Sequence, residues 1–231
     1  MMKREDFLSG PVSVTAYDWV PGLAQGYVRD LRLRWALEEA GFPYDADLLP
    51  LAERASASNL TRQPFGQVPA MQVGDLSMFE SGACAWRIAE ASDVLLPDDA
   101  TERQACFSWF FAALDSLGQP IDRCGYLRYF AEDREAAERI EPQARDFLRL
   151  RLSRLADALG DRPFLVGGRF TIADLMMSVV LRNAETTGDL DAFPALGDYV
   201  RRNTGRPAFQ RAMEAQMQPF RKNAAKYEPA G

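Results

Sequence analysis

The hydrophobic periodicity of this chain changes near residue 93, and that change is what most limits the folds open to it. Before residue 93, stretches in which apolar residues alternate, as in a strand, are interleaved with stretches of helical spacing. Beyond it the apolar stripes have helical spacing, as the leucines between 148 and 159 illustrate. The sequence therefore predicts an α/β domain over residues 1–93 and an all-helical domain over residues 94–231.

The first domain is predicted to have the order β-α-β-α-β-β-α. A right-handed crossover through a helix makes its first two strands parallel, whereas a hairpin makes its last two strands antiparallel. The sequence therefore predicts a mixed four-stranded sheet. The strands before the hairpin are expected at residues 12–19 and 43–50, and the helices at residues 27–41, 52–61 and 81–92.

The hairpin lies in the stretch FGQVPAMQVGDLSMFES, residues 65 to 81. Gly74 and Asp75 form its two-residue turn, and Pro69 takes the first strand position. Because proline donates no ladder hydrogen bond, Pro69 must lie at a strand start or on an edge strand. The backbone next to Pro69 is then free for another partner, and we expect a ligand there.

The composition argues against several classes of function. The chain has no histidine, which excludes imidazole catalysis, histidine-dependent triads and most zinc sites. Its net charge is -6, with arginines dispersed among carboxylates, which disfavours nucleic acid as a partner. No apolar run of about 18 residues occurs, and no apolar segment follows the start MMKREDFLSG. We expect a cytoplasmic protein that uses no metal and binds no membrane.

The 3 cysteines, Cys84, Cys106 and Cys124, form no CxxC pair and fall in predicted helices. We interpret them as small buried hydrophobic residues, with a reactive thiol as the alternative. The cysteines therefore imply no disulfide framework.

A helix start is predicted within FTIADLMM, residues 170 to 177. Thr171 is the expected N-cap, and Asp174 three residues later reaches back to the cap amide, as in a capping box.

Four stretches taken together resemble the cytosolic glutathione transferase family. The resemblance covers nearly the full chain, and the class within the family, of bacterial type, is left open. It implies a thioredoxin-like N-terminal domain, a cis-proline before the third strand, a helical C-terminal domain with the electrophile site and dimer contacts, and a homodimer. The stretches are RWALEEAGFPY (34–44), QPFGQVPA (63–70), FESGACAWRIAE (79–90) and FLVGGRFTIADL (164–175).

The resemblance implies that the hairpin region binds glutathione. A cis Val68-Pro69 bond would present the amide and carbonyl of Val68 to the peptide backbone of glutathione, as an added strand does. Glu80 would meet the ammonium of the γ-glutamyl group, and Ser81 with the amides of the following helix N-terminus would meet its carboxylate. From the residues alone, Ser81 is a helix cap and Glu80 a favourable charge near a helix start.

Further binding residues follow from the same resemblance. Gln67 would reach the glycyl end or the cysteinyl backbone, and Arg54 the glycyl carboxylate, with a solvated helix face as the alternative for Arg54. Phe107, Phe110 and Phe111 would wall a pocket for an apolar electrophile, with a helix–helix core as the alternative use of at least half of these rings.

Two residues are candidates for the group that activates the glutathione thiol. Relatives use a serine, cysteine or tyrosine between the first strand and the first helix, yet residues 16–30 contain neither serine nor cysteine. Counting back from the helix selects Tyr27, and counting forward from the strand selects Tyr17. We expect Tyr27, ahead of Tyr17, to contact the sulfur, with packing on the first helical turn as the alternative for Tyr27.

The resemblance thus implies an enzyme that uses glutathione as co-substrate. It would conjugate or reduce an apolar electrophile with the bound thiolate, in the role of a detoxification transferase. A glutathione-dependent peroxidase and a non-catalytic glutathione- or ligand-binding protein of the same fold are the alternatives.

Overall fold

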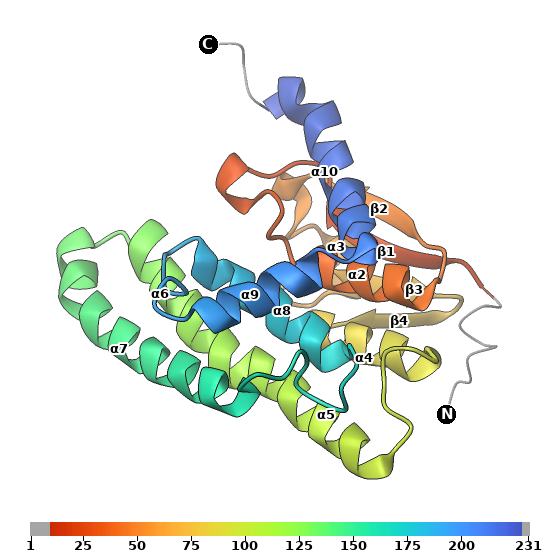
Figure 1. Ribbon diagram of the computed structural model, residues 1–231. Helices are drawn as coiled ribbons and strands as arrows, with labels where there is room; N and C mark the ends of the chain where they lie inside the picture. Colours follow the sequence, from red (N-terminus) through yellow and green to blue (C-terminus); the bar gives the residue numbers. More distant parts are fainter. Residues whose placement is uncertain (1–9, 228–231) are drawn as a thin grey trace. The chain divides into compact units, whose positions relative to one another are not determined.

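The computed structural model describes residues 10–227 (Figure 1). Contacts within the chain define two compact units. Of the described residues, those up to Leu95 and those from Arg206 onward form one unit, and Leu96 to Gly205 form the other. The sequence predicts residues 94–231 as one helical domain, whereas the structure groups the last helix with the first unit. The predicted roles of the two domains, glutathione binding in the first and an electrophile site in the second, stay predictions.

The first unit contains a mixed sheet of 4 strands in the order β2-β1-β3-β4. β1 (Val12–Tyr17) pairs in parallel with β2 (Asp45–Leu49) and antiparallel with β3 (Ala70–Val73). β4 (Leu76–Phe79) completes the antiparallel hairpin with β3. The predicted α/β topology is therefore confirmed. Pro69 precedes a central strand, so the backbone that it leaves free lies at the start of that strand.

The helices of the first unit lie close to the predicted positions, with two exceptions. The helix predicted over residues 52–61 is instead a 3-10 helix, Leu51–Glu53, followed by an α-helix that begins at Ala57. The helix predicted from residue 27 begins at Asp30, because the chain before it forms a short 3-10 helix and turns. It ends at Gly41, whose φ of 69° is left-handed. The helices are α2 (Asp30–Ala40), α3 (Ala57–Arg62), α4 (Ser81–Ala91) and α10 (Pro207–Tyr227), and the 3-10 helices are η1 (Gly22–Ala24) and η2 (Leu51–Glu53).

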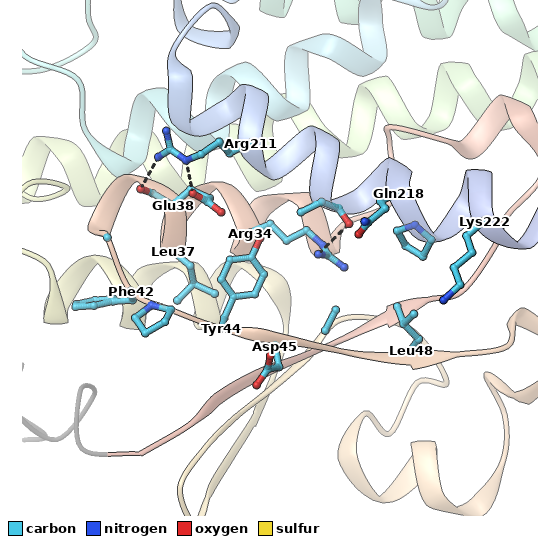
Figure 2. A pocket seen from close by; sticks show the side chains of 15 residues that line it. Arg34, Leu37, Glu38, Phe42, Tyr44, Asp45, Leu48, Arg211, Gln218 and Lys222 are labelled. Carbon is cyan, nitrogen blue, oxygen red and sulfur yellow. Dashed lines mark hydrogen bonds and ion pairs between the residues drawn. The ribbon is translucent and has the colours of Figure 1, made fainter.

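α10 belongs to the first unit because it packs along α2 (Figure 2). Arg211 Nε donates a hydrogen bond of 2.7 Å to Glu38 Oε2, and Arg34 Nη1 reaches a main-chain carbonyl of α10. The Trp35 ring meets the Phe209 ring edge-on, with centroids 4.8 Å apart. α2 is therefore buried between the sheet and α10.

The second unit consists of helices arranged around the buried helix α8 (Ile172–Glu185). The predicted stripe of Leu148, Leu152, Leu155 and Leu159 is buried, which confirms its core role. The π-helical segment η3 (Ala113–Gly118) joins two of the helices without a break. The others are α5 (Ala100–Ala112), α6 (Gln119–Tyr129), α7 (Arg134–Leu159) and α9 (Pro194–Thr204).

The capping box predicted at the start of α8 is confirmed. The Thr171 N–H donates to Asp174 Oδ2 at 2.9 Å. Asp174 Oδ1 also accepts from the Leu165 N–H at 2.8 Å and from the Tyr199 hydroxyl at 2.9 Å. Asp174 therefore ties α8 to the preceding loop and to α9, and its burial raises the pKa of its carboxyl.

None of the helices within residues 10–227 is both long and apolar enough to cross a membrane.

Candidate functional site

The expected binding residues of the first unit meet at one end of its sheet. The ladder between β3 and β4 ends at the pair Ala70–Phe79, so the next residues outward, Pro69 and Glu80, are neighbours. β1 runs antiparallel to β3 and therefore ends, at Tyr17, on the same side. This end of the sheet thus combines the start of β3, the start of α4 and the last residue of β1.

The start of β3 is held by a buried threonine. The Val68-Pro69 peptide bond is cis, and both of these side chains are buried. The Ala70 N–H donates to Thr15 Oγ1 at 2.6 Å, and the Thr15 hydroxyl lies 3.4 Å from the Ala70 carbonyl oxygen. Thr15 on β1 therefore fixes the residue that follows Pro69.

Two buried side-chain amides shape the loop that leads to Pro69. Asn59 Nδ2 donates to the carbonyl of Arg54 at 2.8 Å and to that of Gln67 at 3.2 Å. Gln63 Oε1 accepts from the N–H of Phe65 at 2.7 Å and from that of Gln67 at 3.4 Å. Asn59 thereby joins the backbone of Arg54 to that of Gln67, while both of their side chains stay exposed.

Gly66 allows this loop to turn. Its φ of 64° lies in the left-handed region, and a Cβ placed on it would come within 3.1 Å of the Arg54 carbonyl oxygen. Another residue at this position would displace the loop that carries Gln67.

Glu80 has an unusual backbone conformation for its residue type. Among residues 10–227 it is the only residue other than glycine with a positive φ, 66°. Such a conformation costs on the order of 1–3 kcal/mol and persists where the surroundings impose it, often at functional sites. The carbonyl of Glu80 accepts from the Cys84 N–H at 2.9 Å, so α4 starts directly behind this exposed residue.

Ser81 does not cap α4, which corrects its interpretation from sequence. The helix begins at Ser81 itself, and no side chain makes a cap bond at its N-terminus. The Ser81 hydroxyl instead accepts a hydrogen bond of 3.1 Å from Arg32 Nη1. Ser81 is 6% exposed and Arg32 7% exposed, so a buried guanidinium lies beside the positive end of α4.

Sequence reasoning missed Arg32, Thr15, Asn59 and Gln63 as residues that build this site. Arg32 had a signal, because it is a charged residue directly between two leucines of a predicted helix. The other three are ordinary polar residues, and nothing in their neighbourhood in the sequence marks the main-chain groups that they bind.

Tyr17 offers a protonated hydroxyl at this end of the sheet. Burial raises the pKa of its phenol above the ordinary value of 10.0, the Arg54 charge opposes this rise, and the Asp30 charge adds to it. The phenol therefore keeps its proton at neutral pH and can donate a hydrogen bond.

Tyr27 lies in the turn between η1 and α2. Its N–H donates to the Ala24 carbonyl at 3.0 Å, and its side chain is half-buried. Because α2 begins at Asp30, Tyr27 is not on the first turn of this helix. The alternative that Tyr27 packs as part of that turn is therefore wrong. That Tyr27 contacts a bound sulfur stays a prediction.

The three aromatic residues expected to wall an apolar pocket lie in α5 of the second unit. Phe110 is fully buried, so the helix-core alternative applies to it. Phe107 and Phe111 are exposed, with ring centroids 4.7 Å apart. Their role in an electrophile pocket stays a prediction.

The cysteines are free and buried, which confirms their structural interpretation. Burial, with a smaller contribution from the Glu80 charge, raises the pKa of the Cys84 thiol to about 12. Burial also raises the pKa of Cys106 and of Cys124. At neutral pH these thiols are protonated.

A separate cavity of about 760 Å³ lies between α2, β2 and α10, lined among others by Arg34, Tyr44, Leu48 and Lys222 (Figure 2). None of the expected glutathione-binding residues lines it. The described part of the chain also holds no group of three acidic, cysteine or histidine side chains arranged to bind a metal.

Two family models match the chain. The model of the glutathione S-transferase N-terminal domain matches residues 13–90, and that of the C-terminal domain matches residues 135–202. The glutathione S-transferase-like protein gedE of Aspergillus terreus is 27% identical over 217 residues, 84% of this chain and 94% of the relative. The disulfide-bond oxidoreductase YfcG of Escherichia coli is 26% identical over 193 residues, 81% and 86% of the two chains.

Solved structures share the fold. A glutathione transferase from Burkholderia graminis, with two glutathione molecules bound per subunit, superposes with a TM-score of 0.78 at 21% identity, covering 89% of this chain and 88% of the other. A glutathione transferase from Pseudomonas putida, with one glutathione disulfide bound per subunit, gives a TM-score of 0.76 at 21% identity, covering 88% and 91%.

Proposed function

Because the chain belongs to the cytosolic glutathione S-transferase family, we propose that it binds glutathione at the sheet end described above and joins the intact tripeptide, through its sulfur, to an apolar electrophile. The observation that carries the proposal is the junction of β4 and α4. There Glu80, an exposed residue with a strained backbone, directly precedes a helix N-terminus that has the buried guanidinium of Arg32 beside it.

This junction suits the zwitterionic γ-glutamyl group. The carboxylate of Glu80 pairs with the ammonium of the γ-glutamyl group. The carboxylate of the γ-glutamyl group is stabilised by the first amides of α4 and by the charge of Arg32. Because the Ser81 oxygen accepts from Arg32, its own proton is free to be donated to the γ-glutamyl carboxylate.

The rest of the tripeptide follows the start of β3. The cysteinyl backbone pairs with the main chain of Val68 in the manner of an added strand. Gln67 and Arg54, joined through Asn59, lie at the glycyl end and bind its carboxylate and amide.

The chemistry requires the bound thiol to ionise at neutral pH. A free thiol ionises near pH 8.5, so the site must favour thiolate by about two pKa units, roughly 2.7 kcal/mol. A tyrosine hydroxyl, from Tyr27 or else Tyr17, donates to the sulfur. The thiolate then forms a new S–C bond with the electrophile, and a leaving group departs with the bonding electron pair.

A second candidate is glutathione-dependent thiol–disulfide exchange. It is favoured by the relative named as a disulfide-bond oxidoreductase and by the related structures that contain glutathione disulfide or two glutathione molecules. Because the cysteines of this chain are buried with raised pKa values, such exchange would have to use the sulfur of glutathione alone. This candidate would be favoured if the protein turned over a mixed glutathione disulfide but did not turn over an aryl halide.

Glu80→Ala tests the binding mode. Losing one partner of a charge-assisted hydrogen bond costs about 1.5–3 kcal/mol, so we expect glutathione binding to weaken by about 10-fold or more in isothermal calorimetry. Asp75→Asn is the matched control, because it removes a like charge from the opposite end of β4. Absence of binding heat for wild type in millimolar glutathione, or identical titrations of wild type and Glu80→Ala, would refute the site.

We also propose that the protein is a homodimer, as the family membership suggests.

A further inference from the structure

α10 fastens the start of the β1–α2 loop, which we define as residues 18–29. Asn223 Nδ2 donates to the Asp18 carbonyl at 3.1 Å. The Tyr227 hydroxyl donates to Asp18 Oδ2 at 2.8 Å, and its ring stacks on the Trp19 ring with centroids 5.0 Å apart. Asp18 is buried, and its Oδ2 also lies 3.5 Å from Lys226 Nζ, so Tyr227 and Lys226 together partner one oxygen of a carboxylate that is largely removed from water.

The same helix fastens the end of the loop. Gln216 Nε2 donates to the Val28 carbonyl at 3.1 Å and to Asp30 Oδ1 at 2.6 Å. The other carboxylate oxygen of Asp30 accepts from Arg34 Nε at 2.7 Å. Gln216 and Asp30 are both fully enclosed. Gln216, Asn223 and Tyr227 are spaced by seven and then four residues, which places them on one face of α10.

Inside the β1–α2 loop, several bonds are local. Gln25 Nε2 donates to the Val20 carbonyl at 3.0 Å, and the Tyr27 N–H donates to the Ala24 carbonyl at 3.0 Å. Such bonds shape the loop. At its start the Asp18 N–H also donates to the Leu49 carbonyl, at the end of β2, at 3.0 Å, and the contacts from α10 add to this bond in holding the loop.

We propose that Asn223 and Tyr227 are positioning residues for the group that activates the glutathione thiol. They hold the β1–α2 loop, which follows Tyr17 and contains Tyr27, in the arrangement that lets a phenol meet the sulfur. This inference rests on the proposed function. Asn223 and Tyr227 act through Asp18 and Trp19, not by touching the substrate. Because hydrogen bonds weaken steeply with distance and angle, a loosened loop stabilises thiolate less.

α10 provides its own control. Arg211, through its ion pair with Glu38, attaches the helix to α2 without touching the loop. Arg211→Ala therefore reports the general effect of weakening α10. Tyr227→Phe removes the hydroxyl and keeps the ring that stacks on Trp19, and Tyr227→Leu removes both. Asn223→Ala removes the bond to the Asp18 carbonyl. Lys226 Nζ, 3.5 Å from Asp18 Oδ2, is kept in all three variants.

The first readout is the ultraviolet thiolate absorbance of bound glutathione against pH, with its dissociation constant measured by calorimetry. Protein thiols contribute little thiolate absorbance near neutral pH, because burial raises their pKa values. We expect the pKa of the bound thiol to rise by about half a unit in Tyr227→Phe and Asn223→Ala and by about one unit in Tyr227→Leu, with affinity changed less than about threefold. Arg211→Ala should leave this pKa unchanged.

The second readout needs no glutathione. Amide hydrogen exchange of residues 19–29 in the free protein should be faster in the Tyr227 and Asn223 variants than in Arg211→Ala. Of the two Tyr227 variants, Tyr227→Leu should exchange faster than Tyr227→Phe. Tyr227→Phe keeps the comparison valid if Tyr227→Leu does not fold.

The outcomes separate the two proposals. Wild type that binds no glutathione refutes the proposed function, and the positioning role falls with it. If wild type binds and ionises glutathione but the Tyr227 and Asn223 variants have the same bound-thiol pKa as Arg211→Ala, only the positioning role is overturned. Faster loop exchange without a change in thiol pKa overturns it too, because α10 would then order a loop that does not place the activating group.

Discussion

Arg32 shows how one buried side chain can shape the electrostatics of the candidate site. It lies on α2, yet its guanidinium reaches Ser81 at the start of α4. A buried arginine and a helix N-terminus both favour an anion at the same point. The γ-glutamyl carboxylate of the proposed ligand is such an anion.

We therefore expect Arg32→Met to weaken glutathione binding by about 10-fold or more, since hydrogen bonds and contacts to charged groups contribute about 1.5–3 kcal/mol. Arg32→Lys keeps the charge and should recover part of the affinity. Calorimetry, with a thermal melt of each variant to establish that it is folded, measures the effect. Unchanged affinity in a folded Arg32→Met protein would show that the anion binds elsewhere.

Asp174 gives a pH dependence whose sign follows from its raised pKa. The folded protein binds the proton of the Asp174 carboxyl more tightly than the unfolded chain does. The contribution of Asp174 to the unfolding free energy therefore decreases as the pH rises from about 4 through its folded-state pKa. The difference in unfolding free energy between wild type and Asp174→Asn should therefore grow as the pH falls from 7 toward 4. Urea unfolding at several pH values measures it, and a difference that shrinks on acidification would contradict the raised pKa.

At the scale of helices and strands, Thr171 separates stability from binding. Its capping box starts α8 in the second unit, whereas the expected glutathione-binding residues lie in the first. Thr171→Ala should lower the unfolding free energy by about 1 kcal/mol and leave glutathione affinity nearly unchanged. Thermal or urea unfolding, together with calorimetry, tests both parts. Lost binding at unchanged stability would show that Thr171 has a role beyond the fold.

The elements that sequence predicts well are those whose pattern is local. The strands of the sheet and the hairpin turn follow from alternation and from Gly74-Asp75, and the start of α8 follows from Thr171. The start of α2 was placed too early, because Val28 continues the helical spacing although the chain there forms turns. Periodicity shows which residues share a face but not whether the backbone has become helical.

Long-range partners are what the sequence did not reveal. An amphipathic pattern shows that α10 has an apolar face but not that α2 covers it. The same limit applies within the site. The residue types at Pro69, Glu80 and Ser81 pointed to glutathione through the family resemblance, whereas the bond from Arg32 to Ser81 spans 49 positions and depends on the fold.

At the scale of the whole molecule, the family membership describes a fold and a co-substrate class, and the electrophile, the cytoplasmic location and the dimer stay predictions. The proposed homodimer has a candidate contact in the first unit. Phe65 is 69% exposed and Phe79 42% exposed, and their ring centroids lie 6.3 Å apart. Exposed aromatic groups that adjoin each other often mark protein interfaces.

We expect Phe65→Ser to shift wild-type dimers toward monomers, because it removes a large apolar side chain from this contact. Light scattering at micromolar concentration should give wild type about twice the chain mass of 25.8 kDa and the variant a value nearer 25.8 kDa. Leu48→Ser is the control, since Leu48 is similarly apolar and 42% exposed but lies on β2, at the opposite edge of the sheet from β4. Wild type with the mass of one chain refutes the homodimer, whereas a Phe65→Ser protein that stays dimeric places the interface on another surface.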